Sequence, residues 1–178
     1  MDVADLLNRC LKKEPAAQRQ FVEQYGKRIM VVCHRYATTT LEPSDIFQEA
    51  FIKIFAVLDQ FDSEKGIIEA WIYRITVNVA LKLIRKNIKY DQASEIADHV
   101  DNEDLRTELN DSLSYNELLG FINQLPDMQR LIFNMYAIEG FNHEEIAEQL
   151  GVTGSTSRSQ YSRAKVKLKA MHEAYNNE

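Results

Sequence analysis

The stretch that decides the fold reads Phe141-Asn142-His143-Glu144-Glu145-Ile146-Ala147-Glu148-Gln149-Leu150-Gly151-Val152-Thr153-Gly154-Ser155-Thr156-Ser157-Arg158-Ser159-Gln160-Tyr161-Ser162-Arg163-Ala164-Lys165. It predicts two short helices joined by a tight turn, a helix-turn-helix. Asn142 and Glu145 lie three residues apart and predict a capping box at the start of the first helix. Gly151 supplies the positive φ that ends this helix, and either Thr153 or Ser155 caps the second.

The second helix of this motif has two different faces. The inward face is predicted to hold Ser157, Tyr161, Ala164, Leu168 and Met171. The outward face is predicted to hold Arg158, Ser159, Ser162 and Arg163. Short hydroxyls and arginines suit base edges and phosphates in a major groove. An ordinary helical hairpin is the alternative, and the combination of cap, glycine turn and basic face favours DNA binding over it.

The composition bounds the class of protein. The 178 residues include only 3 Pro and 6 Gly, which favours an all-helical chain of one or two small domains. Cys10 and Cys33 are far apart in the sequence, which predicts a reducing compartment with neither a disulfide nor a metal site. The acidic start is no signal peptide, and no apolar run is long enough to span a bilayer. We therefore expect a soluble, cytoplasmic protein with no membrane segment.

The charge is unevenly distributed. The net charge of -6 is unusual for a protein that binds nucleic acid. Residues 91–112 alone carry -7, whereas residues 1–90 carry +3 and residues 113–178 carry -2. Because DNA is contacted by local patterns of charge, the total does not exclude a DNA-binding protein. The acidic stretch divides the chain into a domain at 1–90, a linker at 91–113 and a second domain at 114–178.

Two helices of the first domain carry notable polar faces. A helix from about residue 43 to 60 has a wide apolar stripe, and Asp45, Gln48, Glu49 and Lys53 lie opposite it. The pattern alone favours a merely solvated face for these four. A helix from about residue 69 to 87 is predicted to bury Ile72, Ile75, Val79 and Leu83. Its other face carries Trp71, Arg74, Asn78, Lys82 and Arg85. Such a face suits separated DNA strands, and a solvated face is an equally good interpretation.

Several of these blocks, in this order, resemble the extracytoplasmic-function group of bacterial sigma factors. The matching blocks are Asp45-Ile46-Phe47-Gln48-Glu49-Ala50-Phe51, Trp71-Ile72-Tyr73-Arg74-Ile75-Thr76-Val77-Asn78, Leu125-Pro126 with Arg130, Glu139-Gly140-Phe141, and the helix-turn-helix. The resemblance covers nearly the whole chain. The Trp71 to Asn78 block ahead of a linker and a helix-turn-helix is its most specific part.

The resemblance implies a mechanism and the residues that carry it. The protein would bind core RNA polymerase, direct it to one class of promoter and help to open the DNA, without a cofactor and without catalysing a reaction itself. The polymerase-binding residues would be Asp45, Gln48 and Glu49. The minus-ten element would be contacted by Asn78, Trp71, Arg74, Lys82, Arg85 and Lys86, together with Ser63 and Lys65 of the loop at 61–70. The minus-thirty-five element would be read by Thr156, Arg158, Ser159, Ser162 and Arg163. An anti-sigma protein would be a further partner.

The chain departs from the family pattern in its recognition helix. Ser155 stands where the family usually has Gly, Ser157 where it has Val, and Gln160 where a basic residue is common. We expect the polar Ser157 to loosen the packing of this helix, because it removes apolar burial. The missing cation at position 160 is expected to weaken phosphate contact slightly.

Two other classes of function compete with this interpretation. A free-standing helix-turn-helix regulator would bind operator DNA without polymerase, but it leaves residues 43–86 unexplained. An enzyme is disfavoured, because the His143-Glu144-Glu145 run lacks the second histidine of a metalloprotease motif: position 147 is Ala.

Overall fold

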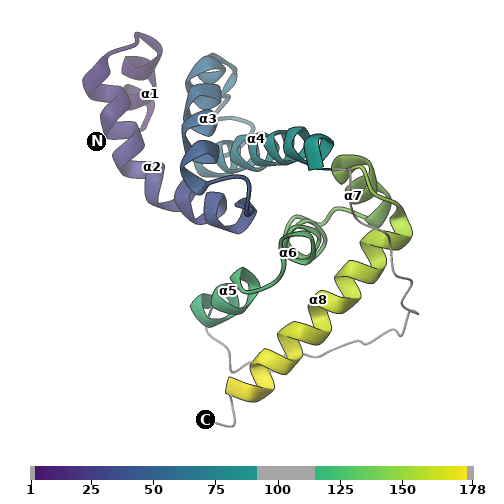
Figure 1. Ribbon diagram of the computed structural model, residues 1–178. Coiled ribbons are helices and arrows are strands. Elements are labelled where there is room, and N and C mark those ends of the chain that lie inside the picture. Colours follow the sequence, from purple (N-terminus) through teal and green to yellow (C-terminus); the bar gives the residue numbers. More distant parts are fainter. Residues whose placement is uncertain (1–2, 92–114, 176–178) are drawn as a thin grey trace. The chain divides into compact units, whose positions relative to one another are not determined.

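The structure is a computed structural model that describes residues 3–91 and 115–175, and these residues form an all-α protein (Figure 1). The helices of the first part are α1 (Val3–Leu11), α2 (Pro15–Tyr36), α3 (Pro43–Ala56), the short 3-10 helix η1 (Leu58–Gln60) and α4 (Ile68–Asp91). Those of the second part are α5 (Tyr115–Asn123), α6 (Asp127–Phe133), the π-helical turn η2 (Asn134–Ile138), α7 (His143–Leu150) and α8 (Gly154–Tyr175). Internal contacts divide the chain into two compact units, Met1–Ile84 and Arg85–Glu178. The predicted linker at 91–113 lies, apart from Asp91, outside the described residues.

Aromatic packing between α2 and α3 forms the core of the first unit. Phe21 is fully buried, and its ring lies 4.7 Å from that of Tyr25 and 6.4 Å from that of Phe51 between ring centroids. Gly26, in the middle of α2, has no side chain, and the Phe47 ring packs against that gap: a Cβ there would lie 3.4 Å from the ring. This close approach explains a glycine inside a long helix, where it otherwise costs about 1 kcal/mol.

Both cysteines belong to this core. Cys10 of α1 and Cys33 of α2 are buried free thiols. Burial raises the pKa of Cys33 to about 12, because the interior disfavours the thiolate. A protonated, buried thiol is a poor nucleophile, so these cysteines act as apolar packing groups.

The buried face of α4 differs from the predicted one. Ile72 is buried as expected, but Ile75, Val79 and Leu83 are only half buried. The buried residues of the helix include Ile68, Ile72, Thr76, Val77, Ala80, Leu81 and Ile84. The prediction failed because Thr76 counts as polar in a periodicity argument. Its hydroxyl is satisfied within the helix, where it donates to the Ile72 carbonyl at 2.8 Å, so it can lie in the core.

A buried arginine links α2 to α4. Arg35 is only 5% exposed, and its guanidinium donates a 2.7 Å hydrogen bond to the Tyr73 hydroxyl. The guanidinium carbon also lies 5.7 Å from the centre of the Tyr73 ring. Hydrogen bonds from charged donors are stronger than neutral ones, so this contact helps to fix the rotation of α4 about its axis.

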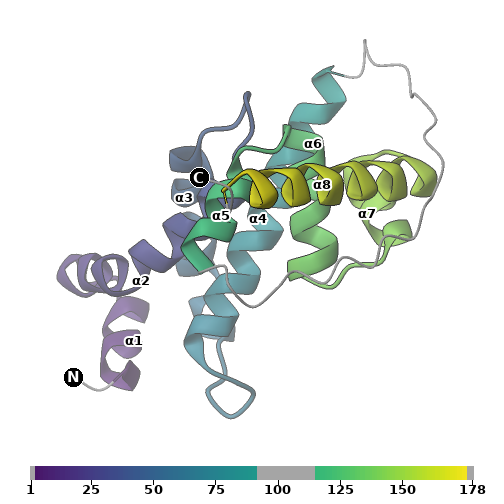
Figure 2. The same ribbon diagram turned by 90° about the horizontal axis from the view of Figure 1, so that it is seen from below.

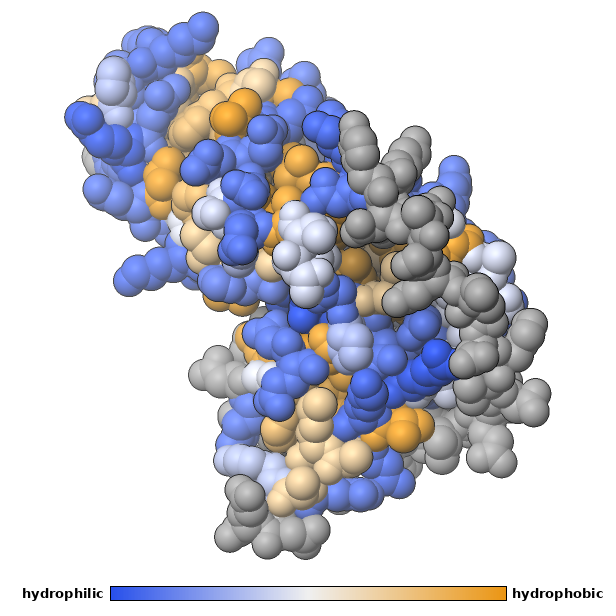
Figure 3. Space-filling model, viewed as in Figure 1, coloured by the Kyte–Doolittle hydropathy of each residue, from blue (hydrophilic) through white to orange (hydrophobic). Residues whose placement is uncertain are grey.

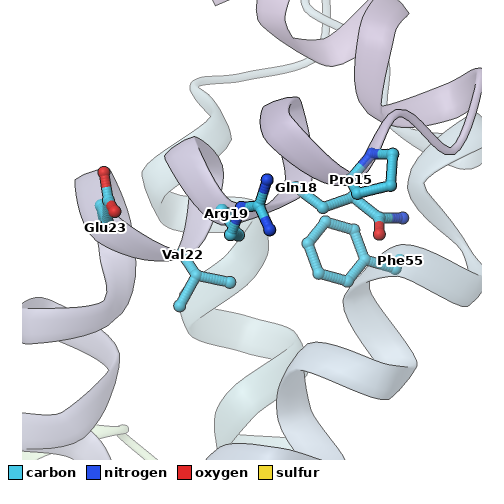
Figure 4. Close-up of a pocket in the computed structure, with 6 residues that line it drawn as sticks. All are labelled: Pro15, Gln18, Arg19, Val22, Glu23 and Phe55. Carbon is cyan, nitrogen blue, oxygen red and sulfur yellow. The ribbon is translucent and has the colours of Figure 1, made fainter.

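A shallow hollow lies between the start of α2 and the end of α3 (Figure 4). Its lining residues are Pro15, Gln18, Arg19, Val22, Glu23 and Phe55. Apolar side chains gather on the surface over these two helices (Figure 3). The hollow contains one guanidinium and one carboxylate, so its charges are balanced.

The second unit is built around α8. Its core includes Ile122, Leu125, Phe133, Ala164 and Leu168. Arg130 stabilises the connection between α5 and α6. Its guanidinium pairs with the Asp127 carboxylate at 2.7 Å and donates to the carbonyls of Asn123 and Leu125, each at 3.3 Å.

The helix that follows Leu125-Pro126 ends in a way that the sequence did not indicate. Its last turn widens into η2, where the Glu139 amide donates to the Asn134 carbonyl, five residues back, at 3.0 Å. Asn134 and Met135 are both fully buried, although they are adjacent in sequence. Gly140, with φ of 78°, then turns the chain toward α7.

The predicted helix-turn-helix is confirmed at its ends. The Asn142 side chain accepts from the Glu145 amide at 2.9 Å, and the Glu145 carboxylate accepts from the Asn142 amide at 2.8 Å. Gly151 ends α7 with φ of 71°. Of the two candidate caps for the second helix, Thr153 is the one that accepts from the backbone, at 3.1 Å from the Thr156 amide.

Candidate nucleic-acid interface

Most of the polar face of α4 is presented to solvent. Arg74, Asn78, Lys82 and Lys86 are exposed, and Trp71 and Arg85 are partly buried. They recur at three- and four-residue steps, so they form one continuous stripe along the helix. The stripe combines an amide, an aromatic ring and cations. The Arg35–Tyr73 contact lies on a neighbouring side of the same helix.

The loop that precedes α4 is held by a turn of its own. The Asp62 carboxylate accepts from the Glu64 amide at 3.0 Å and pairs with the Lys65 ammonium at 3.0 Å. These two contacts lower the pKa of Asp62, the lysine having the larger effect. Ser63 and Lys65 are exposed on this turn, as a DNA-contacting role requires. The loop protrudes from the start of α4 (lower part of Figure 2).

An aromatic pair joins this loop to the helix. The Phe61 and Trp71 rings meet edge to face, with centroids 5.6 Å apart. Both residues are partly buried, so part of the indole surface stays accessible. Edge-to-face packing restricts the plane of the indole.

The outward face of α8 is less exposed than the face of α4. Arg158 is exposed, whereas Thr156, Ser159, Ser162 and Arg163 are partly buried. Several hydroxyls have local partners: Ser159 donates to the Thr156 carbonyl at 3.0 Å, and the Thr153 and Thr156 hydroxyls lie 2.9 Å apart. These contacts fix side-chain rotamers at the start of the helix before any DNA is present.

An ion pair crosses the turn of the helix-turn-helix. The Arg158 guanidinium of α8 lies 2.9 Å from the Glu144 carboxylate of α7. Both groups pack over Gly154, where a Cβ would lie 3.3 Å from the carboxylate and 3.4 Å from the guanidinium. The absence of a side chain at position 154 thus leaves room for the pair. Glu144 was not among the predicted site residues.

Ser157 makes a contact that the sequence did not indicate. It is fully buried, yet its hydroxyl shares a 2.9 Å hydrogen bond with Nδ1 of His143 on α7. Because the buried hydroxyl has a hydrogen-bond partner, burying Ser157 does not leave a polar group unsatisfied. The His143 ring also stacks on Tyr136 of η2, with centroids 4.4 Å apart. Burial, with a smaller effect of Arg158, lowers the pKa of His143 and favours its neutral form.

The polar face of α3 forms a third candidate surface. Asp45, Gln48 and Glu49 are all exposed, as the sequence predicted. Ile52 lies on the same stripe, four residues after Gln48, and is 62% exposed. Ile52 was not among the residues predicted for this surface.

Comparison with known families accounts for these surfaces. The family described as sigma-70 region 2 matches residues 21–89, and the family described as sigma-70 region 4 matches residues 115–168. The chain belongs to the sigma-70 family. The first match contains the α3 and α4 faces, and the second contains the helix-turn-helix up to Leu168. Proteins of this family bind core RNA polymerase and promoter DNA, so the chain is a sigma factor and the alternative of a free-standing regulator is not supported.

Curated relatives place this sigma factor in the extracytoplasmic-function group. It is 30% identical to the ECF RNA polymerase sigma factor SigE of Mycolicibacterium smegmatis, over 84% of this chain and 59% of that protein. It is 28% identical to the ECF RNA polymerase sigma-E factor of Haemophilus influenzae, over 90% of this chain and 89% of that protein. The solved sigma factor RpoE of Bartonella quintana, in complex with the anti-sigma factor NepR, is 20% identical with a TM-score of 0.46 and covers 87% of this chain and 96% of that one.

Proposed function

We propose that the chain binds core RNA polymerase, directs it to a specific class of promoter and promotes opening of the DNA. The observation that carries the proposal is the α4 face, on which a half-buried indole is followed along the helix by exposed cations and an exposed amide. A protein that only bound duplex operator DNA would have no need of this surface. Aromatic stacking, amide contacts and cations together suit a strand whose bases are unpaired.

We assign contact with the minus-ten element to the first domain, residues 1–90. Asn78 reads the edge of an unpaired base, while Arg74, Lys82, Arg85 and Lys86 hold the neighbouring phosphates. Trp71 offers a stacking surface that Phe61 keeps in place. Ser63 and Lys65 approach the same strand from the loop before α4.

The minus-thirty-five element is assigned to the second domain, residues 114–178. Arg158, Ser159, Ser162 and Arg163 face the major groove of the duplex, with Thr156 near the start of the helix. The capping box and Gly151 set the angle between α7 and α8, so the recognition helix meets the groove as a rigid unit.

Docking on the polymerase is assigned to the α3 face. Asp45, Gln48 and Glu49 supply polar and acidic groups around the exposed Ile52. An apolar centre with a polar rim is the usual composition of a protein interface.

The remaining parts of the proposal concern the linker, a partner and the compartment. The acidic linker at 91–113 runs in channels of the polymerase that otherwise hold nascent RNA. An anti-sigma factor is a further partner that masks DNA-binding surfaces. The protein works in the cytoplasm, where the polymerase is, and catalyses no reaction itself. No helix in the described parts of the chain is both long and apolar enough to cross a membrane.

Run-off transcription tests the proposal directly. Purified core polymerase with the wild-type protein is incubated with a library of duplex promoter fragments, and the transcribed fragments are recovered and sequenced. We expect one promoter class to be enriched over core polymerase alone. Failure to bind core polymerase, or binding without initiation on any fragment, would show the proposal to be wrong.

A further inference from the structure

We propose that His143 is a positioning residue for the recognition helix α8, and that its contact with Ser157 is needed to distinguish one upstream element from another. This inference rests on the proposed function, in which α8 reads the minus-thirty-five element. His143 is the first residue of α7 and is not among the residues assigned to DNA. Its role is indirect, because it acts through α8 and not by touching a base.

Two adjacent residues of α7 hold two adjacent residues of α8. Nδ1 of His143 lies 2.9 Å from the Ser157 hydroxyl, and the Glu144 carboxylate lies 2.9 Å from the Arg158 guanidinium. Adjacent residues project about 100° apart around the axis of a helix. Two contacts of this kind therefore resist rotation of α8 about its axis as well as its displacement from α7.

The buried contact of the two is the stronger constraint. Ser157 is fully buried and His143 is partly buried, whereas Glu144 and Arg158 are both exposed. Water and salt weaken an ion pair at the surface, so it holds a helix only loosely. A buried hydrogen bond is costly to break, because the buried group then lacks a partner. The orientation of α8 is therefore set mainly by His143 and Ser157.

Two tyrosine rings restrict the imidazole itself. The His143 ring stacks on Tyr136 of η2, with centroids 4.4 Å apart and planes inclined by 14°. The Tyr161 ring of α8 lies 4.5 Å from that of Tyr136 and 5.8 Å from that of His143 between centroids. The imidazole thus faces α8 at two positions one helical turn apart, Ser157 and Tyr161. Held in this way, it has little freedom to follow a displaced α8.

The direction of the Ser157 hydrogen bond supports a link between helices. A buried hydroxyl can be satisfied within its own helix, as Thr76 is when it donates to the Ile72 carbonyl in α4 at 2.8 Å. Ser157 instead bonds to a residue of a different helix. A neutral imidazole has one donor and one acceptor nitrogen, so it can serve a hydroxyl in either sense. The bond therefore couples α7 to α8 instead of only satisfying a buried group.

The residues that follow Ser157 are those assigned to the bases, beginning with Arg158 and Ser159. A small rotation of α8 moves their side chains away from base edges, where hydrogen bonds need a fixed geometry. Phosphate contacts tolerate the same rotation, because they depend mainly on charge. Loss of the His143 contact should therefore reduce sequence discrimination and leave sequence-independent binding nearly unchanged.

Competition between two promoters tests this role with the holoenzyme. One is a promoter recovered with the wild-type protein, and the other differs from it only in a shuffled upstream element. We expect Ser157→Ala and His143→Phe each to lower the ratio of the two affinities by roughly tenfold, the scale of one base contact. The first change removes the hydroxyl alone, and the second keeps a ring for stacking but cannot form the hydrogen bond. Affinity for the shuffled promoter and its dependence on salt should stay at the wild-type values.

A double-mutant cycle shows whether the two residues act together. Because either change breaks the same hydrogen bond, the double variant should discriminate no worse than the poorer single variant. The matched control is His172→Phe, the same substitution in the last turn of α8, which should keep wild-type discrimination. Hydrogen exchange of amides in α7 and α8 verifies that each variant is folded. If His143→Phe loses this protection, Ser157→Ala carries the test, since alanine favours a helix.

Unchanged discrimination by Ser157→Ala would overturn the positioning role. Equal weakening on both promoters would do so too, since a merely structural contact gives that result. Additive losses in the double variant, or a loss by His172→Phe as large as that by His143→Phe, would also overturn it. A wild-type holoenzyme that binds both promoters equally would overturn the assignment of α8 to the upstream element, whereas a discriminating wild type beside unaffected variants would overturn the positioning role alone.

Discussion

The faces of α4 and α8 differ in how exposed their side chains are and in how many of them already contact other protein groups. The four residues Arg74, Asn78, Lys82 and Lys86 of α4 are exposed, and this helix is linked to α2 by a buried contact on another side. On α8 most of the corresponding residues are half buried, and Arg158 already pairs with Glu144. A separated strand is flexible and suits adaptable side chains, whereas a duplex groove is rigid and suits a fixed surface. Each helix therefore matches the state of the DNA that we assign to it.

The largest effect is expected where the α4 surface is held in place. Arg35→Ala removes the buried guanidinium and its packing, and should lower the free energy of unfolding of the first unit by about 3 kcal/mol. Tyr73→Phe, which removes only the accepting hydroxyl, should cost about half as much. Urea unfolding followed by fluorescence measures both, because Trp71 is the only tryptophan in the chain and lies in this unit. Equal stability of all three proteins would show that the contact does not hold α4.

Asn78→Ala should reduce promoter opening by at least roughly tenfold, because it removes contacts to a base edge that are worth about 1–3 kcal/mol. Binding to core polymerase should be unchanged, since Asn78 is exposed and belongs to a different helix from the α3 face. Opening is followed by permanganate reactivity, and core binding by titration of a labelled protein. Parallel loss of both activities would mean that Asn78 is structural.

Arg158→Ala and Arg163→Ala should each weaken binding to a duplex that contains the upstream element by about five- to tenfold, with no effect on a pre-opened minus-ten fragment. Gel-shift titrations of the holoenzyme on the two kinds of template separate these outcomes. Unchanged duplex binding by both variants would show that another face of α8 meets the DNA.

A smaller effect, a loss of stability of α7 and α8, is expected when the pH is lowered. The folded unit lowers the pKa of His143 from its ordinary value of 6.5, so the unfolded chain takes up the proton first as the pH falls. The contribution of neutral His143 to the stability of α7 and α8 is therefore complete above about pH 6.5, and it declines as the pH falls toward the lowered pKa. Hydrogen exchange of amides in these helices at about pH 7 and about pH 5.5, corrected for intrinsic rates, measures the decline. His143→Gln removes the titrating group, so a decline of the same size in that variant would contradict this assignment.

The smallest effect is expected from the ion pair that covers Gly154. Glu144→Gln releases Arg158 from a partner that competes with phosphate, and it also removes a negative charge near the DNA. Exposed ion pairs contribute little, so upstream-duplex affinity should rise only a few-fold, and the gain should shrink at high salt. Glu148→Gln, an exposed change elsewhere on α7, is the matched control. Weaker binding of Glu144→Gln would instead mean that Glu144 positions Arg158 for contact.

The sequence predicted well those features that depend on neighbouring residues. The Asn142 and Glu145 cap and the Gly151 turn each arise within one or two helical turns, where residue chemistry dictates geometry. Other features depend on long-range packing and could not be predicted. The Arg35–Tyr73 contact joins residues 38 positions apart, and the buried role of Thr76 required knowledge of what covers α4. The exposure of Ile52 and Ile67 could likewise not be predicted, because the sequence pattern does not show whether another part of the chain covers an isoleucine.

The widened turn η2 has a consequence for comparing this chain with its relatives. A turn closed by a bond to the fifth preceding residue contains one residue more than an α-helical turn. A relative that closes the same turn in the α-helical way needs one residue fewer between Phe133 and Glu139. An alignment without a gap would then shift every correspondence on one side of this turn by one position. Residue roles transferred across residues 134–138 should therefore be anchored separately, on Arg130 before the turn and on Gly151 after it.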